Sequence, residues 1–344
     1  MSRADAVAAV LWVGATLYAV FGGADFGAGL WALLAGGGRR GRRPRALIAW
    51  AIGPVWEANH VWLIFVLVAL WTSFPDAFSS IFSTLFIPLS LAALGIVLRG
   101  AGFAFHGVAA RLGGRRVAEA LFGASSVLTP FFMGTVVGAI AAGRVPVGNA
   151  AGDPVASWLN PLSLLVGALF VATSAYLAAV FLVSDARRLD DPALERYFRT
   201  RAIAAAVVAG AIAIASIVAL RDDARYLYDR LIDQGLPLVV LSGVCGIGAL
   251  ALLARSARRG TRELAVGAVV AVIWGWGVAQ FPYLLPERLT IAHGAAPGPT
   301  LTAMLIVFAV AVVLVLPAFG LLYALTQRSM LEGEFDRPRP APGA

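Results

Sequence analysis

Two carboxylic acids lie inside long apolar stretches of this sequence, where a charged group is costly. Asp25 lies in the run GGADFGAG and Glu57 in the run GPVWEANHVWLIF. An acidic side chain at the centre of a membrane helix costs about 2.5–3.5 kcal/mol on insertion scales, so such residues usually have a function. Buried carboxyl groups are common proton carriers. The two acids therefore indicate proton transfer within a membrane.

The two acids are predicted to lie at one depth. Asp25 lies eleven residues before Gly36, and Glu57 lies eleven residues after Ala46. With a rise of 1.5 Å per residue, each acid lies roughly 16 Å from the same end of two adjoining antiparallel helices. We therefore predict that both acids line one polar path that starts at the cytoplasmic end of these helices.

The stretch around Glu57 predicts a helix with a polar face. At 100° per residue, five residues share one arc of about 160°, and Trp62 points away from it. These five residues are Gly53, Trp56, Glu57, Asn59 and His60. His60 is added to the predicted proton path on this ground. The alternative is that these groups bond only to each other or to a neighbouring helix and fix the packing, and for Asn59 both interpretations stay open.

The histidines and the cysteine do not predict a metal or haem site within this chain. A bis-imidazole haem site needs two facing histidines at similar depth, and only His60 is deep, because His106 lies at the cytoplasmic edge and His293 in an external loop. A pair of His60 with Met133 stays open, although a methionine in an apolar helix is usually a packing residue. Cys245 is the single cysteine, which excludes a disulfide or a cysteine-based metal site, and it is expected to pack.

The composition is that of an integral membrane protein. The 344 residues are 60% hydrophobic and 13% charged, far from the average of soluble domains. All 27 basic residues are arginines in short clusters between apolar runs, which argues against a nucleic-acid-binding module. The N-terminal apolar run is too long for the core of a cleavable signal, so the first helix is expected to remain.

The apolar runs predict an all-α polytopic membrane protein with about nine transmembrane helices in helix bundles. We expect one transmembrane domain at residues 1–330 and a disordered cytoplasmic tail at residues 331–344. A spanning helix needs roughly 20 apolar residues. The nine predicted helices lie near residues 5–35, 46–73, 77–99, 120–142, 160–184, 202–220, 237–254, 263–285 and 301–325.

The arginines predict the orientation of these helices. Sorted by alternate loops, 21 arginines fall on one side and 6 on the other. Because basic residues are enriched on the cytoplasmic side, the N-terminus is predicted outside and the C-terminus in the cytoplasm. In this arrangement the loop at residues 221–234 lies outside, and its tyrosines Tyr226 and Tyr228 indicate a short helix at the level of the headgroups.

The motif GPVWEANHVWL resembles the GPVWDGNQVWL-like motif of the second subunit of cytochrome bd-type quinol oxidases. Three other stretches resemble the same family: FGGADFGAGLW in the first helix, RGAGFAFH from Arg99 to His106, and FPYLLPERLTI from Phe281 to Ile291. The chain departs from the family motif by Glu57 for aspartate, Ala58 for glycine and His60 for glutamine. These departures indicate a divergent branch, for which the cyanide-insensitive kind is one candidate.

The resemblance implies one half of a heterodimer in the bacterial cytoplasmic (inner) membrane. The partner, subunit I, would hold haem b and haem d and the quinol site, and this chain would bind no haem alone. Protons for the reduction of O₂ to water would come from the cytoplasm, with Glu57 and Asp25 matching the acids of the family. Trp56, Asn59 and Arg99 would belong to the polar motif or the interface. A quinone bound to this chain is known for some members only and is not assigned.

Two other classes of function stay open from the sequence. A proton-coupled membrane transporter would also bury acids, but it usually shows repeated halves and paired interrupted helices, which are not evident here. A purely structural membrane subunit would explain the 37 glycines but not the pair of acids.

Overall fold

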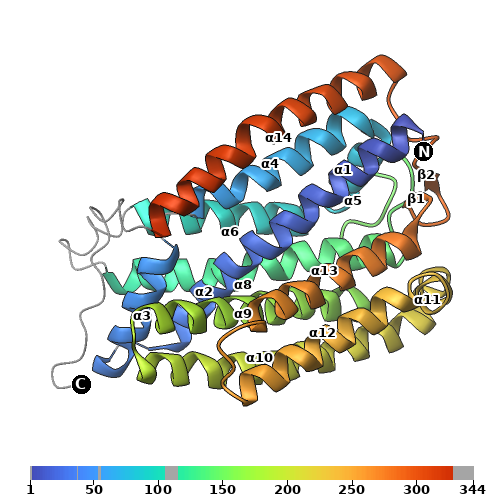
Figure 1. Cartoon of the computed structure of the whole chain (residues 1–344). Helices are drawn as coiled ribbons and strands as arrows, with labels where there is room; N and C mark the ends of the chain where they lie inside the picture. The colour runs from blue at the N-terminus through green and yellow to red at the C-terminus, as the bar shows by residue number, and fades with distance from the viewer. Residues whose placement is uncertain (1, 37, 53–55, 105–114, 328–344) are drawn as a thin grey trace.

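The computed structural model describes residues 2–36, 38–52, 56–104 and 115–327. Long helices run side by side between the two ends of an elongated bundle (Figure 1). Seven of the described helices are long and apolar enough to cross a membrane, or up to eight if one bent pair counts as a single span. The prediction of a polytopic helical membrane protein is therefore confirmed, and the number of nine spans stays a prediction.

The elements differ in length and are mostly helical. In chain order they are α1 (Arg3–Leu17), the π-helix η1 (Tyr18–Gly22), α2 (Gly23–Leu34), α3 (Arg39–Ile52), α4 (Trp56–Ser73), α5 (Pro75–Thr84), α6 (Phe86–Ala104), α8 (Arg115–Ala141), α9 (Pro161–Arg188), α10 (Pro192–Asp223), α11 (Arg225–Ile232), α12 (Leu236–Ala254), α13 (Thr261–Gln280), β1 (Tyr283–Leu285), β2 (Leu289–Thr290) and α14 (Gly298–Gln327).

The first span changes its neighbours halfway along its length. It runs through α1, η1 and α2, in agreement with the helix predicted at residues 5–35. α1 packs against α4 and α14, whereas α2 packs against α8 and α9. The π-helix η1 lies at this change and contacts α4. Short π-helical segments within α-helices frequently occur at functional sites.

The predicted helix at residues 77–99 is wrong as a single helix. α5 ends at Thr84, Leu85 leaves helical geometry, and α6 begins at Phe86. α5 also bends away from α4 by 118°. Two serines of α5 explain where this helix lies. Ser80 Oγ accepts a hydrogen bond from Gly148 N at 3.0 Å, and Ser83 Oγ accepts one from Ala150 N at 2.7 Å. α5 is thus tied to the loop that follows α8.

The predicted helix at residues 263–285 also ends earlier than expected. α13 ends at Gln280, and the chain then forms the antiparallel hairpin of β1 and β2. Phe281 precedes Pro282 and has extended backbone angles, because a residue before proline is disfavoured in helical geometry. The helix expected within residues 221–234 is confirmed as α11, whose Leu227 and Leu231 are buried.

The other predicted helices agree in position with helices of the structure, and two predicted segments lie partly or wholly outside the described residues. The apolar segments predicted at 120–142, 160–184, 202–220, 237–254 and 301–325 correspond to α8, α9, α10, α12 and α14. α10 begins earlier than predicted because Asp191 caps it, accepting from Ala193 N and Leu194 N. The segment predicted at 46–73 comprises α3 and α4, and residues 53–55 between them lie outside the described part, as does the tail at 331–344.

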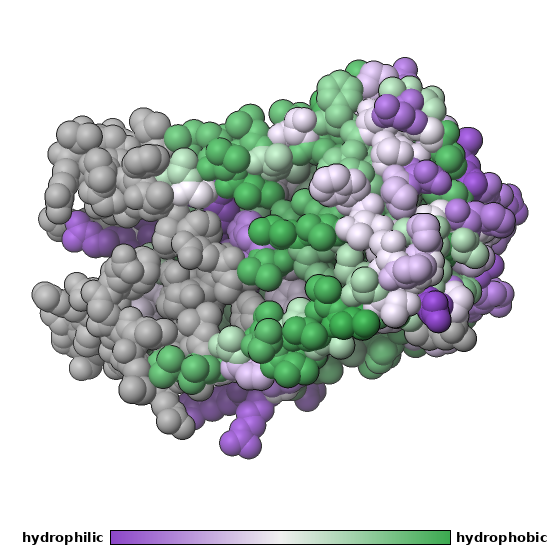
Figure 2. Space-filling view, turned by 90° about the horizontal axis from the view of Figure 1, so that it is seen from above, coloured by the Kyte–Doolittle hydropathy of each residue, from purple (hydrophilic) through white to green (hydrophobic). Residues whose placement is uncertain are grey.

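The surface is apolar along the middle of the bundle. In Figure 2, hydrophobic residues cover the central part of the visible face, and hydrophilic residues gather at the end that carries the N-terminus. Large aliphatic side chains are exposed along the outer helices α10, α12 and α14. Among them are Val207, Ile214, Val244, Ile247, Val313 and Leu314. These surfaces suit contact with lipid acyl chains or with another membrane subunit.

The first span packs on α9 through a glycine. A Cβ atom on Gly27 would lie 1.9 Å from the backbone oxygen of Ser174. Backbones of membrane helices approach this closely only where one residue is very small. We therefore expect Gly27→Ala to destabilise the protein by about 1–3 kcal/mol, the usual cost of overpacking.

The measurement is the midpoint of thermal unfolding of the purified protein in detergent. Gly210→Ala on α10 is the matched control, because a Cβ atom there meets nothing within 4 Å. The Gly27 variant should melt at a lower temperature, and the Gly210 variant should not. Equal melting temperatures for both variants and the unchanged protein would contradict the close contact.

Candidate functional site

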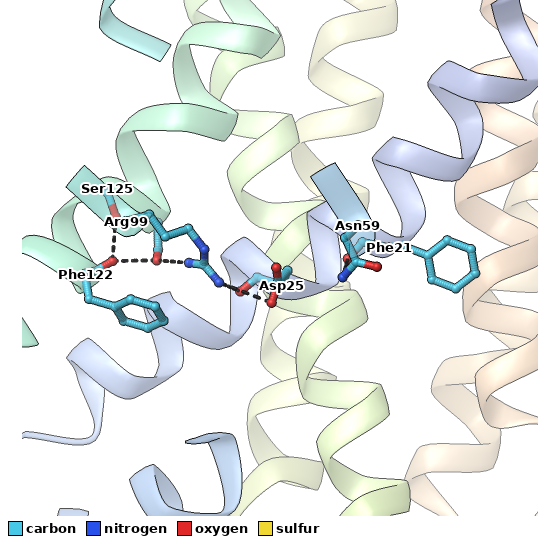
Figure 3. A network of polar contacts seen from close by, with 7 residues as sticks. Phe21, Asp25, Asn59, Arg99, Phe122 and Ser125 are labelled. Atoms are coloured by element: carbon cyan, nitrogen blue, oxygen red, sulfur yellow. Dashed lines mark hydrogen bonds and ion pairs between the residues drawn. The ribbon is translucent and has the colours of Figure 1, made fainter. Parts of the chain in front are cut away.

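A buried ion pair lies between the first span and α6. Arg99 Nη2 lies 3.2 Å from Asp25 Oδ1, and the two side chains are 1% and 2% exposed. Figure 3 shows Arg99 reaching across from α6 to the beginning of α2, where Asp25 lies. Both charges are removed from water, so each depends on the other for compensation.

The guanidinium of Arg99 has further partners on α2 and α8. Arg99 Nη1 donates to Ser126 Oγ at 2.7 Å, and Nη2 also donates to the backbone oxygen of Asp25 at 2.9 Å. The rings of Phe26 and Phe122 lie 4.9 and 4.5 Å from the guanidinium carbon. Cations are attracted to the faces of aromatic rings at such distances. Arg99 therefore joins three helices at one point.

The glycines around Asp25 make room for this pair. A Cβ atom on Gly29 would lie 1.9 Å from Ser126 Oγ and 3.0 Å from Arg99 Nη1. Only a residue without a side chain leaves this space, so the run GGADFGAG shapes the pocket of the guanidinium as well as the packing of the helices. The small residues of this run therefore let Arg99 approach Asp25.

The position of Arg99 corrects one prediction. The sequence placed Arg99 at the end of a helix and left Asp25 and Glu57 as the charges deep in the membrane. In the structure α6 continues past Arg99 to Ala104, and the arginine is fully buried. The apolar residues AGFA that follow Arg99 carried the signal that the helix goes on.

Two residues of the predicted polar face lie beside Asp25. Asn59 is 8% exposed, and its Nδ2 donates to the backbone oxygen of Phe21 at 3.4 Å. The ring of His60 lies between those of Tyr18 and Phe26, with centroids 6.3 and 6.0 Å away in edge-to-face geometry. Both Asn59 and His60 interact electrostatically with the Asp25 carboxyl group. The structure thus brings Asp25, Asn59 and His60 together.

Several predicted residues lie outside the described part or away from this site. Gly53 is not described, and of Trp56 and Glu57 the structure describes only the backbone, at the start of α4. His106 lies outside the described residues as well. Met133 lies within α8, and His293 Nδ1 contacts Thr290 Oγ1 at 2.7 Å near the hairpin. Cys245 lies on α12 as a free, half-buried thiol.

The residues that sequence reasoning missed are polar groups with no charge. Ser126 on α8 and Tyr18 in η1 both lie at this site, and neither stood out in the sequence. Serines and tyrosines are common in membrane helices, so their type alone gives no signal. Among the residues that the structure describes, no group of three or more His, Cys, Asp or Glu side chains could hold a metal ion.

Comparisons with known proteins match nearly the whole chain to one family. The sequence profile of "Cytochrome bd terminal oxidase subunit II" matches residues 4–326. Subunit 2 of a cytochrome bd ubiquinol oxidase from Bacillus subtilis is 25% identical over 287 residues, covering 83% of this chain and 81% of that protein. A second Bacillus subtilis protein, provisionally named cytochrome bd menaquinol oxidase subunit II, is 22% identical over 331 residues, covering 93% and 94%.

A solved structure shares the fold over nearly the whole chain. A chain in the structure of the bd oxidase from Geobacillus thermodenitrificans superimposes with a TM-score of 0.74 at 25% identity. The match covers 97% of this chain and 100% of that one. Because the family profile spans almost all of the sequence, the chain belongs to the family of subunit II of cytochrome bd terminal oxidases.

Proposed function

We propose that this chain is the haem-free second subunit of a bd-type quinol:oxygen oxidoreductase and supplies a proton path from the cytoplasm. It would support a haem-bearing subunit I in the bacterial cytoplasmic membrane, where quinol oxidation drives the reduction of O₂ to water. The observation that supports it best is the buried cluster of Asp25, Arg99, Asn59 and His60. A proton-coupled transporter would also bury acids, but the family match does not favour it.

Among the residues that the structure describes, no second histidine lies within the helices to form a haem site together with His60. The ring of His60 contacts those of Tyr18 and Phe26 in edge-to-face geometry. His293 lies beyond the helices, in the segment after the hairpin. A bis-histidine haem site would therefore lack its second histidine among the described residues. Haem b and haem d are assigned to the partner, and no quinone is assigned to this chain.

In this proposal Glu57 is the group that takes up and releases protons. Its backbone lies in the first turn of α4, two residues before Asn59. The hydrogen bond from Asn59 to Phe21 O holds that turn of α4 against the first span. Phe21 lies one helical turn before Asp25, so the start of α4 and the ion pair belong to one region. The side chain of Glu57 lies outside the described residues, and its role rests on the sequence.

In this proposal Asp25 also holds the path in place, and its predicted part in carrying protons stays a prediction. One of its oxygens faces Arg99, so replacing or neutralising Asp25 would leave a buried guanidinium without its counter-ion. We assign Asp25 and Arg99 the role of holding the first span, α6 and α8 in register around the path. Asp25 also interacts electrostatically with its polar neighbours Asn59 and His60.

The arginine clusters support an orientation of the helix bundle in the membrane. In Figure 1 the connections after α2, α9 and α12 lie at the end opposite to the N-terminus. These connections carry arginine clusters at residues 39–45, 187–201 and 255–262. Because basic residues are enriched at the cytoplasmic side, we assign this end to the cytoplasm and the N-terminus to the outside.

The proposal predicts where haem is found. An affinity-tagged copy of this chain, purified in mild detergent from cells that also make the partner, should co-purify with a protein that carries haems b and d. The same chain expressed without the partner should show no Soret absorbance. Stoichiometric Soret absorbance of the isolated, folded chain would contradict the haem-free assignment, and His60→Ala would then identify the ligand.

A further inference from the structure

Three polar atoms near Asp25 are buried without a hydrogen-bond partner among the described residues. They are Tyr18 Oη, Asp25 Oδ2 and Arg99 Nε. Asp25 uses its other oxygen for the ion pair with Arg99, so Oδ2 remains available. Nearly all buried polar atoms in proteins bond to protein or to ordered water. A cluster of such atoms at one site therefore indicates internal water.

The ring of Tyr18 is held firmly in this cluster. Tyr18 is the first residue of η1, and a Cβ atom on Gly22 would lie 2.8 Å from its Cε2 atom. The ring also meets that of His60 in edge-to-face geometry, and His60 in turn meets the ring of Phe26, the residue after Asp25. The hydroxyl oxygen of Tyr18 is buried, and it interacts electrostatically with Asp25 and Arg99. Its position is thus fixed by the π-helix and by the absence of a side chain at Gly22.

We infer that Tyr18 Oη and Asp25 Oδ2 together bind internal water and that Tyr18 is a further proton-relaying residue of the path. A buried water molecule needs two to four polar partners, and the three atoms named above supply them. Tyr18 precedes Asp25 by seven residues, so the path would continue from Asp25 toward the N-terminal end of the first span.

Proton transfer through this water and Tyr18 leaves the protonation state of the chain unchanged. A proton that arrives at the water beside Asp25 moves along hydrogen bonds, and the Tyr18 hydroxyl accepts one proton as it gives up another. No charge stays on Tyr18 after a turnover. This inference rests on the proposed function, since a path extension has meaning only if protons enter through this subunit.

The test uses the purified complex with Tyr18→Phe, which removes only the hydroxyl group. Quinol-driven oxygen consumption is measured in H₂O and in D₂O, with haem content determined in parallel. We expect turnover to fall by about 100-fold, the lower end of the contribution of a proton-transferring group, with a larger solvent isotope effect and full haem content. Tyr176→Phe is the matched control, because Tyr176 on α9 is also buried with an unpartnered hydroxyl among the described residues.

Tyr176 belongs to a cluster of buried apolar residues built mainly on α9, so Tyr176→Phe should keep normal turnover and a normal isotope effect. Equal losses in the two variants would overturn the inference, and so would loss of haem in Tyr18→Phe, because the hydroxyl would then be structural. Glu57→Gln, measured alongside, separates the two proposals. Normal behaviour of Tyr18→Phe beside an impaired Glu57→Gln would overturn the inference alone, whereas normal turnover in Glu57→Gln would overturn both.

Discussion

Replacing Glu57 by glutamine is expected to lower quinol-driven oxygen consumption of the complex by about 100-fold, the usual range for loss of a proton-transferring group. Glutamine keeps the size and most of the hydrogen bonding of glutamate but cannot exchange a proton. Haem content and yield of the complex should stay unchanged, because α4 loses no packing. The measurement is oxygen uptake by the purified complex at saturating quinol.

Two further variants make this prediction specific. Glu57→Asp keeps a carboxyl group that is one methylene shorter, so it should retain substantial activity through water. Glu263→Gln changes an exposed glutamate in the first turn of α13 and should have no effect. Normal turnover in Glu57→Gln would exclude an essential proton role, and joint loss of haem and assembly would favour a structural role.

Replacing Arg99 by glutamine is expected to prevent assembly of a stable subunit. The change leaves Asp25 buried without its counter-ion, and breaking a buried ion pair from one side costs about 3–5 kcal/mol. It also removes the contacts with Ser126 and with the rings of Phe26 and Phe122. Arg99→Lys should rescue only in part, because an ammonium group cannot reproduce the planar fork of the guanidinium. The measurements are the yield of folded complex and its midpoint of thermal unfolding.

A double variant tests whether the charge itself is responsible. Asp25→Asn alone should also lower the yield, since Arg99 would then be the unpaired charge. The combination of Asp25→Asn with Arg99→Gln removes both charges and should be more stable than either single variant, as expected for two residues in contact. Normal yield and thermal stability of Arg99→Gln alone would show that the pair does not hold these helices together.

The sequence predicts those features of the fold that depend on hydrophobicity. The apolar runs located α8, α9, α12 and α14, because each is long enough to span a membrane by itself. Changes of direction within apolar runs were missed. Leu85 interrupts a continuous apolar run because the serines of α5 bind a loop from elsewhere in the chain, and this tertiary contact leaves no periodic pattern. Phe281 and Pro282 did carry a local signal, since a proline disfavours helix at the residue before it.

The sequence predicted the part of the candidate site that is revealed by the cost of placing an acid in a membrane helix. Asp25 stood out because an acid in an apolar helix is rare, and the structure places Asn59 and His60 beside it. Arg99 was named through the family resemblance but not as a buried charge, because a long basic side chain near the end of an apolar run usually extends to the membrane surface. Its partner could not be foreseen, since the contact joins residues 74 positions apart. Tyr18 was missed because its role depends on a π-helical segment that no residue type marks.

The central claim is that protons for oxygen reduction enter through this subunit, and proton uptake by the reconstituted complex tests it most directly. The complex is placed in liposomes with the arginine-rich end of this subunit facing the medium, and a pH dye outside reports the protons taken up as oxygen is consumed. The unchanged complex should take up protons from that side in step with oxygen consumption, and Glu57→Gln, with its haems intact, should lose both. Proton uptake at the normal rate from that side in Glu57→Gln would contradict the account.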